Sequence, residues 1–188
     1  MKHFFLLAIS LLLSVVSQAQ VKVGEATLPE VVNFQDNELV LNGAGIREKL
    51  WFDLYAAGLY LGAKNHDEQA IINTDQPMSI KMEILSNLIT TKKLLEAFKS
   101  GIEKTNSVSE VKRLKAKQNK FLSFITNEIT IGNVYDLVYT PGVGTELYED
   151  SKLLGTIKGH DFKKLLFNIW LAKKPVDEGL KSGLLGDM

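Results

Sequence analysis

The spacing of apolar residues divides the chain into strands and helices. Over residues 78–85 apolar and polar residues alternate, which predicts a strand with one buried face. Over 90–104 the apolar residues recur at three- and four-residue spacing, as in an amphipathic helix. Alternation returns over 129–139, 145–148 and 153–157, with turn residues between these segments. Such an arrangement predicts an antiparallel meander.

The remaining segments follow the same two periods. We expect one or two short strands in 21–32, a strand at 38–41, and a long, buried strand over 49–61, which is dense in aromatic residues. Ser107 and Glu110 match a capping box and predict the start of a second helix. Two more helices are expected after Asp161 and over 176–185. Strands and helices come in blocks, so the fold class is α+β: an antiparallel sheet covered by a layer of helices.

The first residues are typical of a secretory signal peptide. Lys2 and His3 precede an apolar run from Phe4 to Val16, and small residues follow at 17–19. A membrane anchor is the alternative, but this run is shorter than the roughly 20 residues that span a bilayer. We therefore expect a signal peptide at 1–19 and a single exported domain at 20–188, periplasmic or secreted, with no transmembrane segment after cleavage.

Composition excludes several classes of function. The chain has no cysteine, so disulfides, thiolate metal sites and a cysteine nucleophile are excluded. Its 22 basic and 22 acidic residues balance, which gives no indication of a nucleic-acid partner. Lysines and an arginine over 112–120 form a basic helix face, and a solvated surface explains them better than an anionic partner does.

No pattern predicts metal binding or nucleophilic catalysis. The three histidines are scattered, and the chain lacks both an Asp-x-Asp cluster and a Gly-x-Ser-x-Gly motif. We therefore expect no metal, no cofactor and no catalytic residue of these kinds. Arg47 stands out because it follows the glycine-rich stretch 42–45, which predicts a turn, and precedes the aromatic segment. It is either a surface arginine beside a turn or an anchor for an anion.

Three motifs carry a resemblance to a known family. They are Asn42-Gly43-Ala44-Gly45-Ile46-Arg47, Gly58-Leu59-Tyr60-Leu61, and the late helix ending Ile169-Trp170-Leu171 with Pro175-Val176-Asp177. Together they resemble the chalcone isomerase-like superfamily, and more narrowly its exported bacterial members. The resemblance implies an open-faced β-sandwich, that is, an antiparallel sheet covered by helices. It also implies a cofactor-free protein that is either an isomerase or a fatty-acid binder.

The same resemblance assigns site residues. In both groups the arginine of the Gly-Ala-Gly-x-Arg motif faces a cleft between sheet and helices, and Arg47 matches it. The enzyme's strand threonine corresponds to Tyr55, its helix tyrosine and asparagine fall near Thr90 and Ala97, and its late-helix threonine falls near Ile169. Apolar Ala97 and Ile169 cannot donate the hydrogen bonds of the enzyme's network, which disfavours chalcone isomerase activity.

The leading hypothesis is therefore a non-catalytic binding protein for a fatty acid or similar amphiphilic carboxylate. Arg47 would pair with the carboxylate, and Tyr55 or Tyr60 would add a hydrogen bond. The first alternative is an isomerase or intramolecular lyase, with Tyr55 as proton donor or acceptor. The second is a structural or interaction domain without a cavity beside Arg47.

Overall fold

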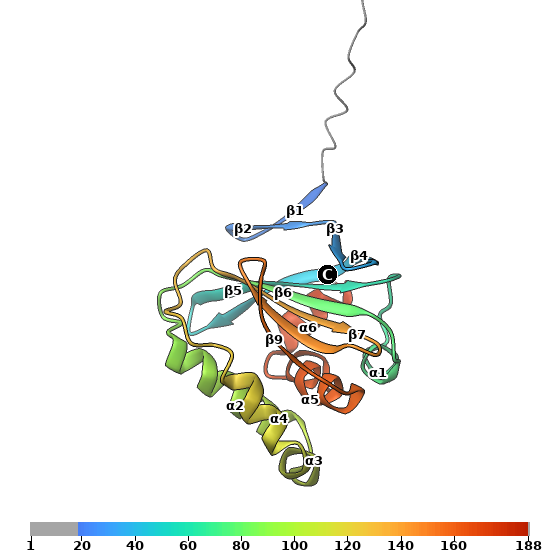
Figure 1. Ribbon diagram of the computed structural model, residues 1–188. Helices are drawn as coiled ribbons and strands as arrows, with labels where there is room; N and C mark the ends of the chain where they lie inside the picture. The colour runs from blue at the N-terminus through green and yellow to red at the C-terminus, as the bar shows by residue number, and fades with distance from the viewer. Residues whose placement is uncertain (1–18, 188) are drawn as a thin grey trace, which may run out of the picture.

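A curled antiparallel sheet with helices on one face forms the fold, so the α+β class expected from the sequence is confirmed (Figure 1). The computed structural model describes residues 19–187. Seven strands pair in the order β3-β4-β5-β6-β7-β8-β9, each antiparallel to its neighbours, and β1 and β2 form a separate hairpin. The strands are β1 (Gln20–Val23), β2 (Ala26–Pro29), β3 (Val31–Phe34), β4 (Asn37–Lys49), β5 (Phe52–Leu61), β6 (Met78–Ile84), β7 (Val134–Thr140), β8 (Gly144–Glu149) and β9 (Lys152–Ile157).

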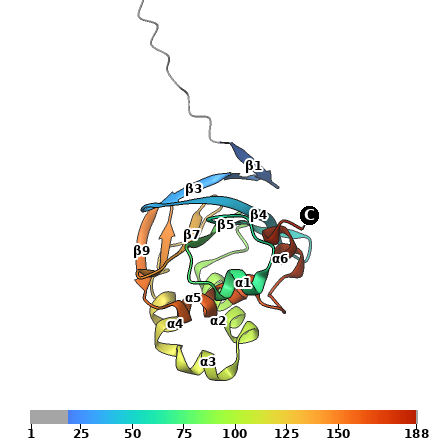
Figure 2. The same ribbon diagram turned by 90° about the vertical axis from the view of Figure 1, so that its right-hand side faces the viewer.

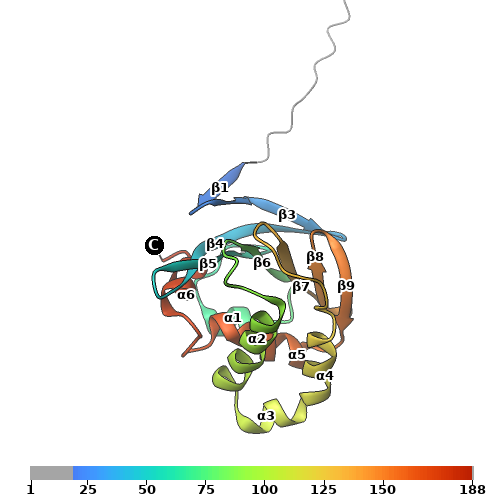
Figure 3. The same ribbon diagram turned by 90° about the vertical axis from the view of Figure 1, so that its left-hand side faces the viewer.

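The helices lie in the connections and at the C-terminal end. They are α1 (Glu68–Asn73), α2 (Thr91–Thr105), α3 (Val108–Arg113), α4 (Lys115–Leu122), α5 (His160–Leu171) and α6 (Glu178–Leu185). The sheet curls over α5, while α2, α3 and α4 extend away from it and the β1–β2 hairpin lies on the opposite side (Figures 2 and 3). No helix in residues 19–187 is both long and apolar enough to cross a membrane. The expected signal peptide lies almost wholly outside the described residues.

The core lies between the sheet and the helical layer. Phe98 of α2 is in edge-to-face contact with Phe121 of α4 and with Trp170 of α5, at centroid distances of 5.3 and 6.1 Å. Phe121 also contacts Phe162, and all four rings are buried. The alternating residues of β6 supply the facing wall, as the pattern over 78–85 predicts. Aromatic pairing of this kind stabilises the contact between α2, α4 and α5 beyond simple burial.

The glycine-rich stretch is not a turn. Residues 42–45 lie inside β4, whose pairing with β5 has two irregularities, one between Leu41 and Gly43 and one between Arg47 and Glu48. A Cβ atom at Gly43 would overlap the Gly183 carbonyl oxygen and would lie 2.7 Å from the Gly186 nitrogen. Gly43 is therefore needed because the backbone of α6 lies directly on this strand.

The expected strand over 49–61 is also corrected at its start. Leu50 and Trp51 form a two-residue turn between β4 and β5, with φ of 49° and 70°. Trp51 is fully exposed and Leu50 is 77% exposed, so these residues are not buried strand. The mistaken expectation came from their apolar character, which usually indicates burial.

Two smaller boundaries differ from the sequence prediction. The strand expected from residue 129 begins only at Val134, because the preceding residues form a turn closed by the Asn133 side chain. The helix predicted from Ser107 has its capping box but divides at Leu114 into α3 and α4. On its basic face, Arg113 and Lys117 pair with Asp161 at 3.0 and 2.6 Å. Part of this face therefore serves contacts within the chain.

Candidate ligand-binding cleft

A cleft of about 640 Å³ lies between the β4–β5 hairpin and helices α2 and α5. This volume is within the range of sites that hold small molecules. Most of its lining is apolar, and its charged side chains are three cations and one carboxylate. The lining side chains from the hairpin are Arg47, Lys49, Leu50, Phe52, Leu54 and Tyr55; those from the rest of the chain are Met82, Leu88, Ile89, Lys93, Leu94, Glu96, Ala97, Phe98, Ser100, Ile169, Trp170 and Val176.

Strand register places Arg47 beside Tyr55. The two residues are cross-strand partners in the β4–β5 pair, and Tyr55 is in turn paired with Ile84 of β6. Directly opposed residues of an antiparallel pair share one face of the sheet. Both side chains therefore point toward the helices, with the Arg47 side chain 23% exposed at the edge of the cleft.

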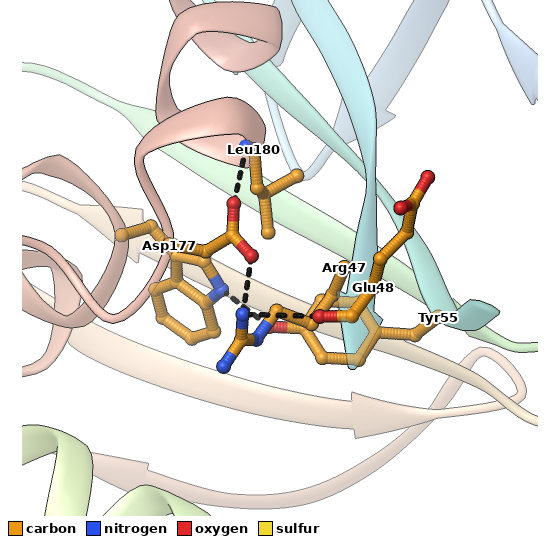
Figure 4. Close-up of polar contacts among 6 residues, drawn as sticks. Arg47, Glu48, Tyr55, Asp177 and Leu180 are labelled. Atoms are coloured by element: carbon orange, nitrogen blue, oxygen red, sulfur yellow. Dashed lines mark hydrogen bonds and ion pairs between the residues drawn. The ribbon is translucent and has the colours of Figure 1, made fainter. Parts of the chain in front are cut away.

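Arg47 also ties β4 to the start of α6. Its Nη1 forms an ion pair with Asp177, the N-cap residue of α6, and donates a hydrogen bond to the Glu48 carbonyl oxygen at 3.3 Å (Figure 4). The other oxygen of Asp177 accepts from the Leu180 amide at 2.7 Å. All side-chain hydrogen bonds of Arg47 within residues 19–187 use Nη1, so Nη2 and Nε remain for an anion. A guanidinium has five N–H donors, which makes such sharing possible.

The Tyr55 hydroxyl is held in place by an indole. Trp170 Nε1 donates to the Tyr55 oxygen at 3.0 Å, and both side chains are buried. Burial raises the pKa of Tyr55 to about 12, and nearby Asp177 adds to the rise, while the Trp170 hydrogen bond and Arg47 oppose it. The hydroxyl is therefore protonated at neutral pH. Because its oxygen already accepts from Trp170, its own O–H is available to donate to a ligand.

Of the residues expected at the site, the structure brings four together in the cleft: Arg47, Tyr55, Ala97 and Ile169. Tyr60 lies on the other face of the sheet, where its hydroxyl donates to the Pro29 carbonyl oxygen at 2.9 Å. Thr90 is the N-cap of α2 and accepts from the Lys93 amide at 3.3 Å, outside the cleft lining. Tyr60 and Thr90, which the sequence analysis expects at the site, therefore lie outside this cleft.

Sequence reasoning missed several contributors to the cleft. Asp177 enters the sequence analysis only as part of a motif, although an aspartate just before a helix is a recognisable N-cap signal. Lys49 and Lys93 gave no signal, because isolated lysines are usually solvated. The hydrogen bond from Trp170 to Tyr55 joins α5 to β5, which are far apart in the chain. Local periodicity carries no information about such a contact.

Two other cavities are less suited to an anion. One of about 980 Å³ lies along β4 near the β1–β2 hairpin and carries three carboxylates (Glu30, Glu48 and Asp177) against two lysines (Lys22 and Lys64). Another, of about 500 Å³, lies by β3 and contains the Lys81–Asp136 ion pair at 2.7 Å. Burial raises the pKa of Asp136. Nowhere in the described residues do three or more His, Cys, Asp or Glu side chains gather as they would around a metal ion.

A comparison with known protein families agrees with the sequence motifs and with the fold. The family model described as chalcone isomerase-like matches residues 20–186, nearly all of the chain. The chain belongs to the chalcone isomerase-like family. This membership confirms the resemblance found in the sequence. No curated protein matches the chain in sequence.

A solved structure of similar fold supports the same assignment. The crystal structure of an Arabidopsis thaliana fatty-acid binding protein matches with a TM-score of 0.72 and 17% sequence identity. The match covers 90% of this chain and 97% of that one. At this identity the likeness shows a shared fold, which is the chalcone isomerase-like arrangement of a curled sheet and helices.

Proposed function

We propose that this chain is an exported, non-catalytic member of the chalcone isomerase-like family that holds a fatty acid or similar amphiphilic carboxylate. One observation carries the proposal: an apolar cleft of about 640 Å³ has the Arg47 guanidinium at its edge and the Tyr55 hydroxyl beside it. With Lys49 and Lys93 against Glu96, the lining has a net positive charge. The fold shared with a fatty-acid binding protein adds support.

The polar edge and the apolar walls of the cleft would bind different parts of the ligand. Nη2 and Nε of Arg47 would donate to the carboxylate in a charge-assisted pair, and the Tyr55 O–H would donate a further hydrogen bond. The apolar walls would take the acyl tail, at about 0.8 kcal/mol for each buried methylene group. Ten such groups outweigh the polar contact, so the tail supplies affinity and Arg47 sets orientation.

Several features favour binding over catalysis. A Tyr55 pKa of about 12 leaves no tyrosinate to act as a base at neutral pH. Ala97 and Ile169, at positions that match the enzyme's polar network, contribute apolar wall.

Export belongs to the same proposal. The pattern of residues 1–19 supports a cleaved leader and delivery to the periplasm or beyond. Determining the N-terminal residue of protein recovered from each cellular fraction tests this part by itself. A mature chain that begins at Gln20 outside the cytoplasm would support export, and an uncleaved chain retained in the cytoplasm would oppose it.

Native mass spectrometry of the purified protein tests the binding proposal. We expect an added mass equal to that of a fatty acid, which extraction then identifies, and loss of this mass in Arg47→Ala. A Lys22→Ala variant is the matched control, because Lys22 lines the other large cavity. An empty protein with no thermal shift across a panel of acyl chains would overturn the proposal.

A further inference from the structure

The mouth of the cleft is surrounded by apolar side chains that face solvent. Leu50 is 77% exposed, Phe52 56% and Leu88 40%, and all three also line the cleft. Trp51, between Leu50 and Phe52 at the tip of the β4–β5 hairpin, is 100% exposed. We refer to Leu50, Trp51 and Phe52 as the apolar tip. Exposed apolar residues gathered at one place mark an interaction surface more often than residues scattered singly.

The backbone of the tip gives a second, independent observation. Leu50 and Trp51 both have positive φ, at the two turn positions where asparagine and glycine are strongly preferred. Bulky residues with positive φ are outliers, and such strain is concentrated at functional sites. Leu50 and Trp51 thus favour neither the geometry of the turn nor the solubility of the protein. Their presence indicates that these two side chains make a functional contact.

We propose that the apolar tip docks onto a lipid bilayer, so that the ligand passes directly between the bilayer and the cleft. This inference rests on the proposed function, since a long-chain fatty acid is exchanged with membranes. The tip and the cleft mouth share Leu50 and Phe52, so a docked tip would place the opening against the acyl chains. Tryptophan and phenylalanine are well suited to the membrane interface.

Charge around the tip favours an anionic bilayer. Lys49 is paired with Phe52 directly behind the turn, and Lys93 lies in the cleft lining on α2, where Glu96 is the one carboxylate. The carboxylates of Glu48 and Asp53 are one residue pair further back along the hairpin. Lys49, the cation nearest the tip, can therefore meet lipid phosphates while Glu48 and Asp53 stay farther from the surface.

Vesicle flotation tests the inference with protein that starts at Gln20, which keeps every described strand and helix and lacks the apolar leader. The vesicles contain phosphatidylcholine with and without phosphatidylglycerol. We expect Trp51→Ser to weaken vesicle binding by about tenfold or more and to slow transfer of a fluorescent fatty acid to vesicles. Its affinity for the same fatty acid in vesicle-free buffer should be unchanged, because Trp51 does not line the cleft.

Val108→Ser is the matched control. Val108 is 86% exposed, but it lies on α3, at the end of the helical layer away from the sheet (Figure 1). This variant should bind vesicles like the unmodified protein. Absence of vesicle binding, or equal vesicle binding by Trp51→Ser and the unmodified protein, would overturn the docking inference. The proposed function would still stand in that case if the protein binds the fatty acid in vesicle-free buffer. Self-association that Trp51→Ser abolishes would instead assign the tip to a protein contact and overturn docking to lipid.

Discussion

Asp177 caps helix α6 with one carboxylate oxygen and pairs with Arg47 through the other. This one residue therefore links the C-terminal helix to the arginine at the edge of the cleft. The close approach of α6 to β4 makes this possible, because Gly43 and Gly45 leave no side chain between them. Arg47 therefore has a structural partner of opposite charge. A ligand carboxylate would share the guanidinium with Asp177 or compete for it.

Replacing Asp177 by asparagine separates these two roles. The amide oxygen can still accept from the Leu180 amide, so the N-cap persists, but the charge that competes for Arg47 is gone. We expect fatty-acid affinity to rise severalfold, with a loss of about 1 kcal/mol in the free energy of unfolding from the partly buried pair. Titration calorimetry and urea unfolding measure the two quantities. A large fall in affinity would mean that the ligand needs the intact pair.

Filling the cleft should prevent binding without damaging the fold. Ala97 is exposed on α2 and lines the cleft, so the Trp side chain of Ala97→Trp would occupy the space meant for an acyl tail. We expect affinity to fall by about tenfold or more, in proportion to the methylene groups displaced, with little change in melting temperature. Ala116→Trp, at an exposed position of α4 outside the cleft lining, should bind normally. Equal effects of the two variants would place the ligand elsewhere.

Gly43 tests the packing of α6 on β4. A Cβ in Gly43→Ala would overlap backbone atoms of residues 183–186, which cannot move without displacing the helix. We expect a loss of about 3 kcal/mol in the free energy of unfolding. Gly62→Ala is the matched control, because no atom lies within 4 Å of its added Cβ, and it should change stability by less than about 0.5 kcal/mol. Similar stability of both variants in chemical unfolding would contradict this packing.

Affinity for a fatty acid should be flat between about pH 6 and 9. Arg47 keeps its charge, the ligand stays ionised, and Tyr55 stays protonated because burial raises its pKa to about 12. The same shift affects stability: the unfolded chain ionises Tyr55 near pH 10, before the folded chain does. Its contribution to stability is thus complete below about pH 10 and is lost as pH rises toward 12. Tyr55→Phe should lower affinity equally across pH 6–9, and a bell-shaped dependence of affinity would instead mean that groups titrating in this range take part in binding.

The spacing of apolar residues predicted those strands and helices that bury one face and expose the other. The alternation over 78–85 became β6, and the apolar stripe over 90–104 became α2, because both patterns report directly which side chains face the core. Alternation also bears on Tyr55 and Tyr60. They are an odd number of positions apart on one regular strand, so they face opposite sides of the sheet, and only one of them can line the cleft.

Features that depend on distant parts of the chain were not predictable in this way. Glycines indicate either a turn or a close approach, and at Gly43 the deciding neighbour is α6, at the other end of the chain. Likewise, Trp51 was expected to be buried because the sequence shows its apolar character and not its position at a hairpin tip. The pairing of Arg47 with Asp177 depends on the same approach of α6 to β4.

The central claim is that Arg47 selects a carboxylate at the edge of an apolar cleft. Comparing the affinities of hexadecanoate and hexadecanol, which share a tail, for the unmodified protein and for Arg47→Gln tests it most directly. We predict that the unmodified protein prefers the carboxylate by roughly 10- to 100-fold, the value of a charge-assisted hydrogen bond. Arg47→Gln should lose this preference while still binding the alcohol, which shows that the variant is folded. Equal affinities in the unmodified protein, or a preference that survives in Arg47→Gln, would contradict the account.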